Sequence, residues 1–283
     1  MKVLVTGARG QLGTDVVARL SAPGHHEVAA TGAADLDVGS RQAVLSAVTG
    51  WRPDLIVNCA AMTAVDRCEA EPDLAYRLNA LGPRHLAEGA ARVGAHLVHV
   101  STDYVFDGTK TGAYLEWDAP NPRSVYGASK LAGEREVLTV APGATVVRTS
   151  WVCGPHGHNM VKTALRLADA GGPMRFVDDQ HGCPTFTADL AAAVVALGVD
   201  RRPGLFHVTN QGPTTWYRFV CDVLAAAGRD PGVVTPITTA DYPLPAPRPA
   251  NSVLDNAALR LSDLPLLADH HEPLARTVRA LLA

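Results

Sequence analysis

The apolar residues in the first half of the chain gather in short runs that alternate with stretches of helical spacing. Short apolar runs favour buried strands, whereas apolar residues three and four apart favour one face of a helix. The strand-like runs occupy residues 1–6, 28–31, 54–61 (with its exit loop), 96–102 and 145–148. The helical stretches occupy residues 14–20, 40–48 and 74–93. This alternation predicts an α/β fold with a doubly wound, parallel sheet of the Rossmann type.

The pattern changes after residue 151. Helical spacing over 161–170 ends at a Gly-Gly-Pro sequence, a short strand is predicted over 175–177, and an alanine-rich helix follows over 188–197. A second helix over 215–227 and a strand over 233–237 complete a smaller C-terminal α/β lobe. We therefore predict a dinucleotide-binding domain over 1–151 with a returning segment near 184–209. The smaller lobe takes 152–183 and 210–283.

Composition narrows the class of protein only slightly. With 283 residues, 47% of them hydrophobic, the chain can bury one large core and a smaller one. A net charge near −3 gives no reason to expect nucleic acid or an anionic membrane as a partner. No signal peptide or long apolar span is present, so we expect a cytoplasmic protein. The five cysteines form no C-x-x-C pair, which argues against a disulfide framework or a thiolate metal site.

A glycine-rich turn follows the first predicted strand directly. Gly7, Gly10 and Gly13 are spaced G-x-x-G-x-x-G and lead into a predicted helix. Gly7 permits a tight turn, Gly10 lets the backbone approach a pyrophosphate, and Gly13 lets helix and strand pack closely. The amides at the helix N-terminus suit an anion, so this turn predicts a dinucleotide site. Ala60 and Thr102 follow other strands at the same edge of the sheet, where they converge with Gly7.

A tyrosine and a lysine are suited to proton transfer. Tyr126 and Lys130 are four residues apart, so on a helix they share one face. Tyrosine has an ordinary pKa of about 10, and a cation about 4 Å away would lower it by roughly three units before desolvation is counted. Because Thr102 lies at the same sheet edge, the three side chains could surround one carbonyl group of a substrate.

Several longer segments resemble one family. The segments are 6–13, 57–66, 101–108, 126–134, 148–151, 178–180, 184–185 and 248–252. They resemble the extended short-chain dehydrogenases/reductases and, among them, the dTDP-4-dehydrorhamnose reductase family, over nearly the whole chain. The glycine turn and the Tyr/Lys pair indicate only the superfamily, whereas Thr-Ala-Val-Asp at 63–66, Ser-Thr-Asp-Tyr-Val-Phe at 101–106 and Arg-Pro-Ala-Asn-Ser at 248–252 are more specific.

The resemblance implies reduction of the C4 ketone of a dTDP-4-keto-6-deoxyhexose in deoxysugar biosynthesis. Tyr126 would donate a proton to the ketone oxygen, Thr102 would hydrogen-bond the same oxygen, and Lys130 would lower the Tyr126 pKa and hold the nicotinamide ribose. Related 4,6-dehydratases carry Asp-Glu after this threonine, because removal of water needs an acid and a base. Here Asp103-Tyr104 follows Thr102, which favours ketone reduction.

The resemblance also implies sets of binding residues. The substrate set, from the smaller lobe and the loops that face it, is Thr63, Val65, Thr102, Tyr104, Phe106, Tyr126, Trp151, Arg248 and Asn251. For Tyr104 and Phe106, core packing is an equally good interpretation. The cofactor set is Gly7, Arg9, Gly10, Gln11, Leu12, Gly13, Asp37, Val38, Ala60, Ala61, Thr63, Tyr126 and Lys130.

The predicted cofactor is NADPH, with NADH also accepted. No acidic residue closes the second strand, where it would select NADH by binding the adenosine ribose. Asp35 and Asp37 come a little later, and Arg9 could contact a 2′-phosphate.

No metal site is predicted. His156 and His158 lack cysteine or acidic residues at ligand spacing. Some members of the family bind Mg²⁺ at a dimer contact, and Asp15 and Asp189 match two of those positions only. Cys153, Met160, His181 and Cys183 depart from the family pattern, which leaves the sugar and its C4 stereochemistry open.

One alternative belongs to another class. Relatives of these reductases serve as noncatalytic NADP-binding regulatory subunits, although an intact Thr102, Tyr126 and Lys130 favour an enzyme. The expected partner is a dTDP-linked 4-keto-6-deoxy sugar, and the chain is expected to be a monomer or a homodimer.

Overall fold

A six-stranded parallel sheet forms the centre of the larger part of the molecule. The computed structural model describes residues 1–21 and 26–283. The strand order is β10-β5-β4-β3-β1-β2, and every neighbouring pair is parallel. The strands are β1 (Lys2–Thr6), β2 (Glu27–Thr31), β3 (Leu55–Asn58), β4 (His96–Thr102), β5 (Thr145–Thr149) and β10 (Gly204–His207). The predicted doubly wound sheet is confirmed, and the chain order reverses between β1 and β3, where such sheets bind ligands.

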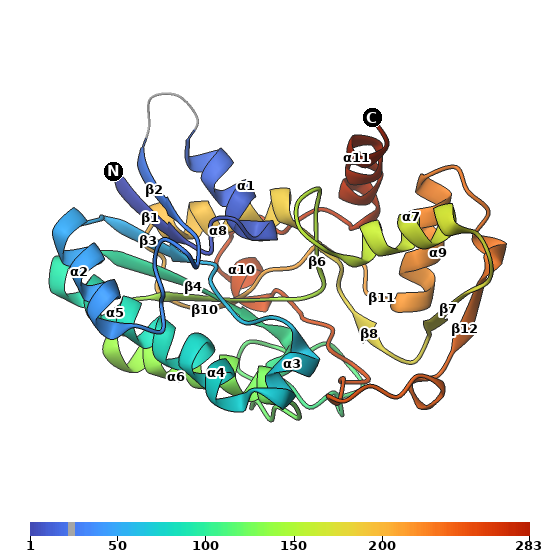
Figure 1. The fold of residues 1–283 in the computed structure, drawn as a ribbon, viewed down its shortest axis with the longest axis horizontal. Coiled ribbons are helices and arrows are strands. Elements are labelled where there is room, and N and C mark those ends of the chain that lie inside the picture. Colours follow the sequence, from blue (N-terminus) through green and yellow to red (C-terminus); the bar gives the residue numbers. More distant parts are fainter. Residues whose placement is uncertain (22–25) are drawn as a thin grey trace.

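Helices cover both faces of this sheet (Figure 1). One face carries α2 (Arg41–Trp51), α5 (Gly82–Val93) and α6 (Val125–Val140); the other carries α1 (Gln11–Leu20), α8 (Thr187–Val199) and the short α10 (Ala257–Leu261). Successive strand residues point to opposite faces. Accordingly Val3 and Val5 pack with α1 and α8, while Leu4 packs with α2 and α5.

The helix predicted over 74–93 contains a wider turn. It comprises α4 (Pro72–Tyr76), a π-helical turn η1 (Arg77–Leu81) and α5, and α3 (Val65–Ala70) precedes it. Asn79 lies in the π turn, fully buried, and its side chain bonds both the amide and the carbonyl of Met62. It also donates to Ser129 Oγ on α6. Isolated π turns are frequent near functional sites, and this one joins the loop after β3 to α6.

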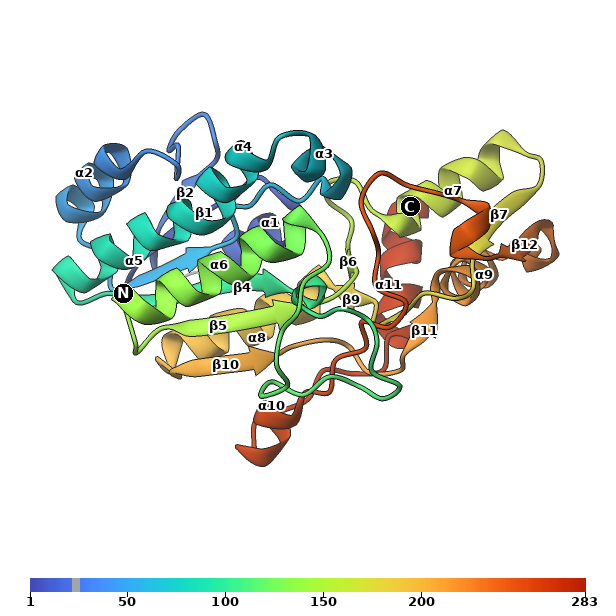
Figure 2. The same ribbon diagram turned by 90° about the horizontal axis from the view of Figure 1, so that it is seen from below.

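A smaller lobe packs around its own core (Figure 2). It contains α7 (Met160–Ala170), α9 (Trp216–Ala226), α11 (His271–Leu282) and the parallel pair β7 (Met174–Val177) and β12 (Val234–Ile237). Two-residue strands connect it to the rest of the chain: β6 (Val152–Cys153), β8 (His181–Gly182), β9 (Thr185–Phe186) and β11 (Thr214–Thr215). The short 3-10 turns are η2 (Asp103–Val105), η3 (Pro231–Val233) and η4 (Thr239–Asp241). Within the described residues, no helix is both long and apolar enough to cross a bilayer.

Candidate functional site

A cavity of about 700 Å³ opens between the carboxyl edge of the sheet and the smaller lobe. The predicted site residues that line it are Gly10, Gln11, Leu12, Gly13, Ala61, Thr63, Val65, Thr102, Tyr104, Tyr126, Lys130 and Trp151. A smaller adjoining cavity of about 230 Å³ is lined by Gly7, Arg9, Gly10, Asp37, Val38, Ala60 and Ala61, among others. The structure therefore brings most of the predicted residues together along one continuous edge.

The glycine turn packs so closely against the protein's own backbone that two of its positions have no room for a side chain. Gly7 has φ +67°, and a Cβ there would lie 2.6 Å from the Ala60 amide nitrogen. A Cβ on Gly13 would lie 2.2 Å from the Gly7 carbonyl oxygen. Gly10 occupies the N-cap position of α1 and has no side chain that could accept a hydrogen bond from the first amides of the helix. These residues fit a dinucleotide pyrophosphate.

Two ion pairs stand at the rim of the smaller cavity. Arg9 Nη2 lies 2.9 Å from Asp35 Oδ2, and its side chain is 72% exposed. Arg77 Nη1 lies 3.0 Å from Asp37 Oδ2, and both side chains of this pair are about half exposed. Exposed pairs of this kind contribute little to stability, so either guanidinium can exchange its carboxylate for a ligand phosphate. Arg77 was not predicted from the sequence, because it is brought here only by the π turn.

The residues predicted to transfer the proton come from two elements that pack closely. Thr102 ends β4, and Tyr126 is the second residue of α6, which is capped by the Ser124 hydroxyl accepting from the Gly127 amide. A Cβ on Gly127 would lie 2.1 Å from the Tyr104 carbonyl oxygen, so only glycine lets α6 approach the turn after β4. The Tyr104 and Tyr126 rings meet edge to face with centroids 5.5 Å apart. Thr102, Tyr126 and Lys130 therefore face the same cavity.

Burial controls the charges of this group. It raises the pKa of Tyr126, with the Thr102 side chain opposing that effect. Burial likewise lowers the pKa of Lys130 to about 8. The Lys130 ammonium donates to the Val100 carbonyl oxygen at 2.6 Å. The expected lowering of the Tyr126 pKa by Lys130 is therefore not seen in this arrangement: loss of hydration around the phenol is the largest influence, and Lys130 is not among the groups that shift this pKa.

Buried polar groups support the strand that presents Thr102. Thr102 Oγ1 and Ser150 Oγ both donate to the Asp103 carboxylate, at 3.0 and 2.9 Å. One residue earlier, Ser101 Oγ donates to Glu134 Oε1 at 2.5 Å, and Arg148 binds Glu134 through two hydrogen bonds of 2.9 and 2.7 Å. These contacts join β4, β5 and α6 behind Thr102, Tyr126 and Lys130. Buried, charge-assisted hydrogen bonds therefore fix the positions of Thr102, Tyr126 and Lys130 relative to one another.

The opposite wall of the cavity is aromatic. Trp151 has φ +46° and stacks on Trp216, the first residue of α9, with centroids 3.5 Å apart and planes 7° from parallel. A Cβ on Gly182 would lie 2.4 Å from the Trp151 ring, so the glycine allows this packing. The sequence predicted Trp151 but missed Trp216. No local signal could have found Trp216, since one aromatic residue at the start of a helix is ordinary in sequence.

Three predicted substrate residues do not line either cavity. Phe106 is 1% exposed and stacks on Tyr114 with centroids 4.1 Å apart, so the structure gives it a packing role. Arg248 forms two hydrogen bonds with the Asp66 carboxylate, at 2.6 and 2.9 Å, which hold the 243–252 loop against α3. Asn251 donates to the carbonyl oxygens of Lys110 and Gly112, so its amide holds two loops together.

Comparisons with known proteins agree with this geometry. The family model described as "RmlD substrate binding domain" matches residues 1–282. A curated relative from Streptomyces antibioticus, "Probable dTDP-4,6-dihydroxy-2-methyloxan-3-one 4-ketoreductase", is 44% identical and covers 100% of this chain and 96% of the relative. A solved dTDP-4-dehydrorhamnose reductase from Clostridium acetobutylicum is 41% identical, with TM-score 0.97 over 100% of both chains. A Bacillus anthracis dTDP-4-dehydrorhamnose reductase, solved in complex with NADP, is 37% identical with TM-score 0.95 over 99% of both chains.

Proposed function

This chain belongs to the RmlD substrate binding domain family, and we propose that it is an NAD(P)H-dependent reductase of the C4 ketone of a dTDP-4-keto-6-deoxyhexose. The reaction belongs to deoxysugar biosynthesis. One observation carries the proposal: Thr102, Tyr126 and Lys130 line a single cavity together with the helix that follows the glycine turn. Tyr104 stands where dehydratases of the superfamily carry glutamate, so the site lacks the second carboxyl group that dehydration needs.

The chain's own residues supply the proton and its control. Reduced nicotinamide, when bound along the glycine turn, supplies the hydride that reaches C4. Tyr126 is protonated at neutral pH, as a phenol is at its ordinary pKa near 10 and also when burial raises that pKa, so it can donate its proton to the oxygen as the oxygen becomes an alkoxide. Thr102 hydrogen-bonds the same oxygen, and the Lys130 ammonium stabilises the phenolate that remains. The product is the C4 alcohol.

The preferred electron donor is NADPH, with NADH accepted as well. Arg9 and Arg77 place two exposed guanidinium groups at the rim of the smaller cavity. An adenosine 2′-phosphate would lie there, beside Asp37. Guanidinium binds phosphate through paired hydrogen bonds. The relative from Bacillus anthracis was solved with NADP, which supports this choice.

The substrate is held between the two walls of the large cavity. Thr63 and Val65 enter it from the loop after β3, Tyr104 from the turn after β4, and Trp151 and Trp216 form the flat wall opposite. A flat indole suits the apolar face of a pyranose ring. We keep Arg248 as the candidate for the nucleotide diphosphate, which it could reach by leaving Asp66.

The test is a turnover assay with purified chain. The protein is mixed with NADPH and a panel of dTDP-4-keto-6-deoxyhexoses, and loss of nicotinamide absorbance is followed. We expect oxidation of NADPH with at least one sugar and a C4 alcohol as product. Tight NADPH binding with no turnover on any sugar would instead indicate a regulatory subunit.

A further inference from the structure

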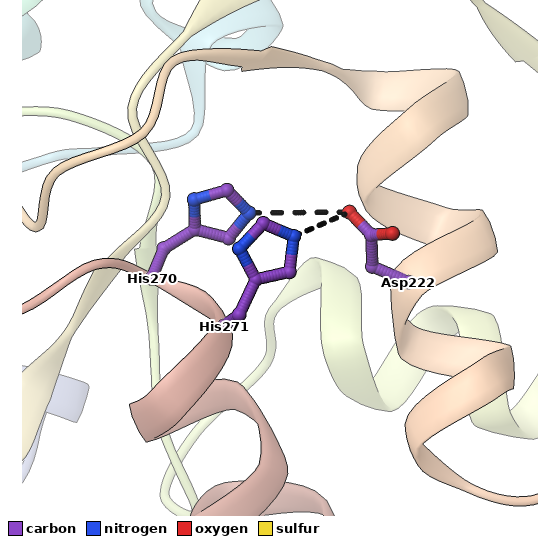
Figure 3. A group of neighbouring side chains, drawn as sticks. All are labelled: Asp222, His270 and His271. Atoms are coloured by element: carbon purple, nitrogen blue, oxygen red, sulfur yellow. Dashed lines mark ion pairs between the residues drawn. The ribbon is translucent and has the colours of Figure 1, made fainter.

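Three potential metal ligands meet in the smaller lobe, away from the cavity. Asp222 comes from the middle of α9, and His270 and His271 stand at the start of α11 (Figure 3). Asp222 Oδ2 lies 3.9 Å from His270 Nε2 and 3.6 Å from His271 Nε2. The three ligand atoms lie within 4.8 Å of one another, and in the described part of the chain no other such group of three is found.

The other ring nitrogens decide which way the lone pairs point. His270 Nδ1 lies 3.2 Å from the Gln211 carbonyl oxygen, which only accepts hydrogen bonds. His271 Nδ1 lies 2.6 Å from the Asp269 carboxylate. Both Nδ1 atoms must therefore carry the proton, and in the neutral imidazoles both Nε2 lone pairs face the Asp222 carboxylate. Metal-binding histidines are held in this way, with the second nitrogen donating to a carboxylate or carbonyl.

His270 provides independent evidence for a missing partner. It is 1% exposed, and its Nε2 is buried without a hydrogen-bond partner. Phe219 packs edge to face on its ring, and the Asp222 carboxylate, 3.9 Å from Nε2, lies beyond hydrogen-bond distance. A buried polar atom without a partner costs about 1–3 kcal/mol, and a bound ion is one explanation for such an atom. Here the unpartnered atom faces the Asp222 carboxylate, and the His271 ring stacks on the His270 ring with centroids 4.1 Å apart.

We propose that Asp222 Oδ2, His270 Nε2 and His271 Nε2 bind a divalent transition-metal ion of the Zn²⁺ class. Two imidazoles and one carboxylate suit Zn²⁺ better than Mg²⁺ or Ca²⁺, which prefer oxygen ligands. Tetrahedral Zn²⁺ with bonds of about 2.0–2.2 Å separates its ligand atoms by about 3.3 Å. The observed 3.6 and 3.9 Å separations are a few tenths of an ångström longer. The two imidazole rings stack with planes 28° apart, so at least the exposed His271 ring must also turn for both lone pairs to meet at the ion.

The ion can reach the site, and binding would join two helices. The His271 side chain is 61% exposed and that of Asp222 is about one-third exposed, so one side of the group is open to solvent. Two further groups, Asp269 and Glu272, bring negative charge to the same end of α11. Metal binding would hold α11 against α9, the helix whose first residue, Trp216, forms the aromatic wall of the cavity.

A proton on His270 Nε2 would compete with the metal ion for this site. Burial alone would lower the pKa of His270, but the Asp222 carboxylate and the Gln211 carbonyl raise it overall. A proton on Nε2 would also satisfy the carboxylate without any metal. Since metal ligands must be deprotonated, Zn²⁺ affinity should fall as pH falls through the histidine range.

The first experiment measures Zn²⁺ binding directly. The EDTA-treated full chain is titrated with ZnCl₂ by calorimetry at pH 7.5, alongside the His271→Ala and Asp222→Asn variants. We expect one ion per chain, and an affinity at least tenfold weaker in each variant. The control is His156→Ala, which removes another exposed histidine beside a carboxylate, Asp15, and should leave the affinity unchanged. No binding by the unmodified chain, or equal binding by all variants, overturns the proposal.

A stability measurement and a crystal complete the test. At about a hundredfold excess of Zn²⁺ over its Kd, the Tm should rise by about 5 °C in the unmodified chain and in the control. It should not rise in His271→Ala. An anomalous difference peak from Zn²⁺-soaked crystals should lie within about 2.2 Å of all three ligand atoms. A peak elsewhere, with none here, rejects the site whatever the outcome of the reductase assay.

Discussion

The two walls of the large cavity are built from different kinds of structure. The sheet wall carries Thr102, Tyr126 and Lys130 on β4 and α6, which a buried Glu134–Arg148 ion pair joins to β5. The lobe wall carries Trp151 and Trp216, and Trp216 packs on the separate core of α7, α9 and α11. Polar bonds hold the first wall, and aromatic stacking holds the second.

Because of this difference, we expect the two walls to have different functions. Proton transfer needs side chains held within a few tenths of an ångström, which buried hydrogen bonds on regular elements provide. Sugar recognition needs a flat apolar surface, which stacked indoles provide. We therefore expect changes in the sheet wall to reduce kcat or the stability of the fold, and changes in the lobe wall to raise the KM for the sugar.

The largest expected effect comes from the proton donor. Tyr126→Phe removes the phenol and keeps the ring, so kcat should fall by about a thousandfold while NADPH affinity changes less than about twofold. Steady-state NADPH oxidation and a fluorescence titration with NADPH measure the two quantities. The exposed Tyr76, on α4, provides the control, since Tyr76→Phe should leave both unchanged. Equal kcat in the two variants would contradict the assignment of the donor.

The next effect is on stability. Glu134→Gln should lower the free energy of unfolding by about 3 kcal/mol, because it leaves the buried Arg148 guanidinium without its countercharge. Urea denaturation followed by circular dichroism measures the change. Glu136 on the same helix pairs with Arg84 at the surface, so Glu136→Gln should cost less than about 1 kcal/mol. Similar losses in both variants would show that burial of the pair is not what stabilises the sheet wall.

Lys130 makes the sheet wall sensitive to pH. Its pKa of about 8 means that kcat/KM should fall as the pH rises above that value, roughly tenfold per pH unit, as the cation is lost from the free enzyme. The pH profile from 6 to 10 measures this. A profile that stays flat to pH 10 would show that the neutral lysine is sufficient.

The same titration should affect stability in the opposite direction. In the folded state the pKa of Lys130 is about 8, whereas in the unfolded chain it has its ordinary value of 10.5. Between these values the unfolded state binds more protons, so the Lys130 contribution to the unfolding free energy should rise with pH. Lys130→Met lacks this titration and is the control. The stability gap between the two proteins should therefore change over this window.

The smallest effect is expected at the lobe wall. Trp216→Ala removes the ring that stacks on Trp151, so the KM for the sugar should rise about fivefold with kcat changed less than about twofold. Trp117 is exposed and lines neither cavity, so Trp117→Ala should change neither constant. A thousandfold loss of kcat in Trp216→Ala would remove the distinction between the walls.

Much of the sheet wall could be predicted from local sequence. Strand, glycine turn and helix follow one another within residues 1–20, and Tyr126 and Lys130 share a helix face through their spacing alone. Parallel strands present their carboxyl ends at one edge of the sheet, so Thr102 could be placed near the glycine turn. The expected effect of Lys130 on the Tyr126 pKa was wrong for this arrangement, because burial, which sequence spacing does not report, dominates it.

The tertiary structure alone decided the rest. Phe106 follows the same motif as Tyr104, yet one packs on Tyr114 and the other reaches the cavity, because a single 3-10 turn directs them apart. Trp216 and the Asp222, His270 and His271 group gain their neighbours from segments distant in the chain. Local sequence determines hydrogen-bonded elements and the faces their side chains share. Contacts between distant elements depend on how complete cores pack, and no short stretch of sequence contains that information.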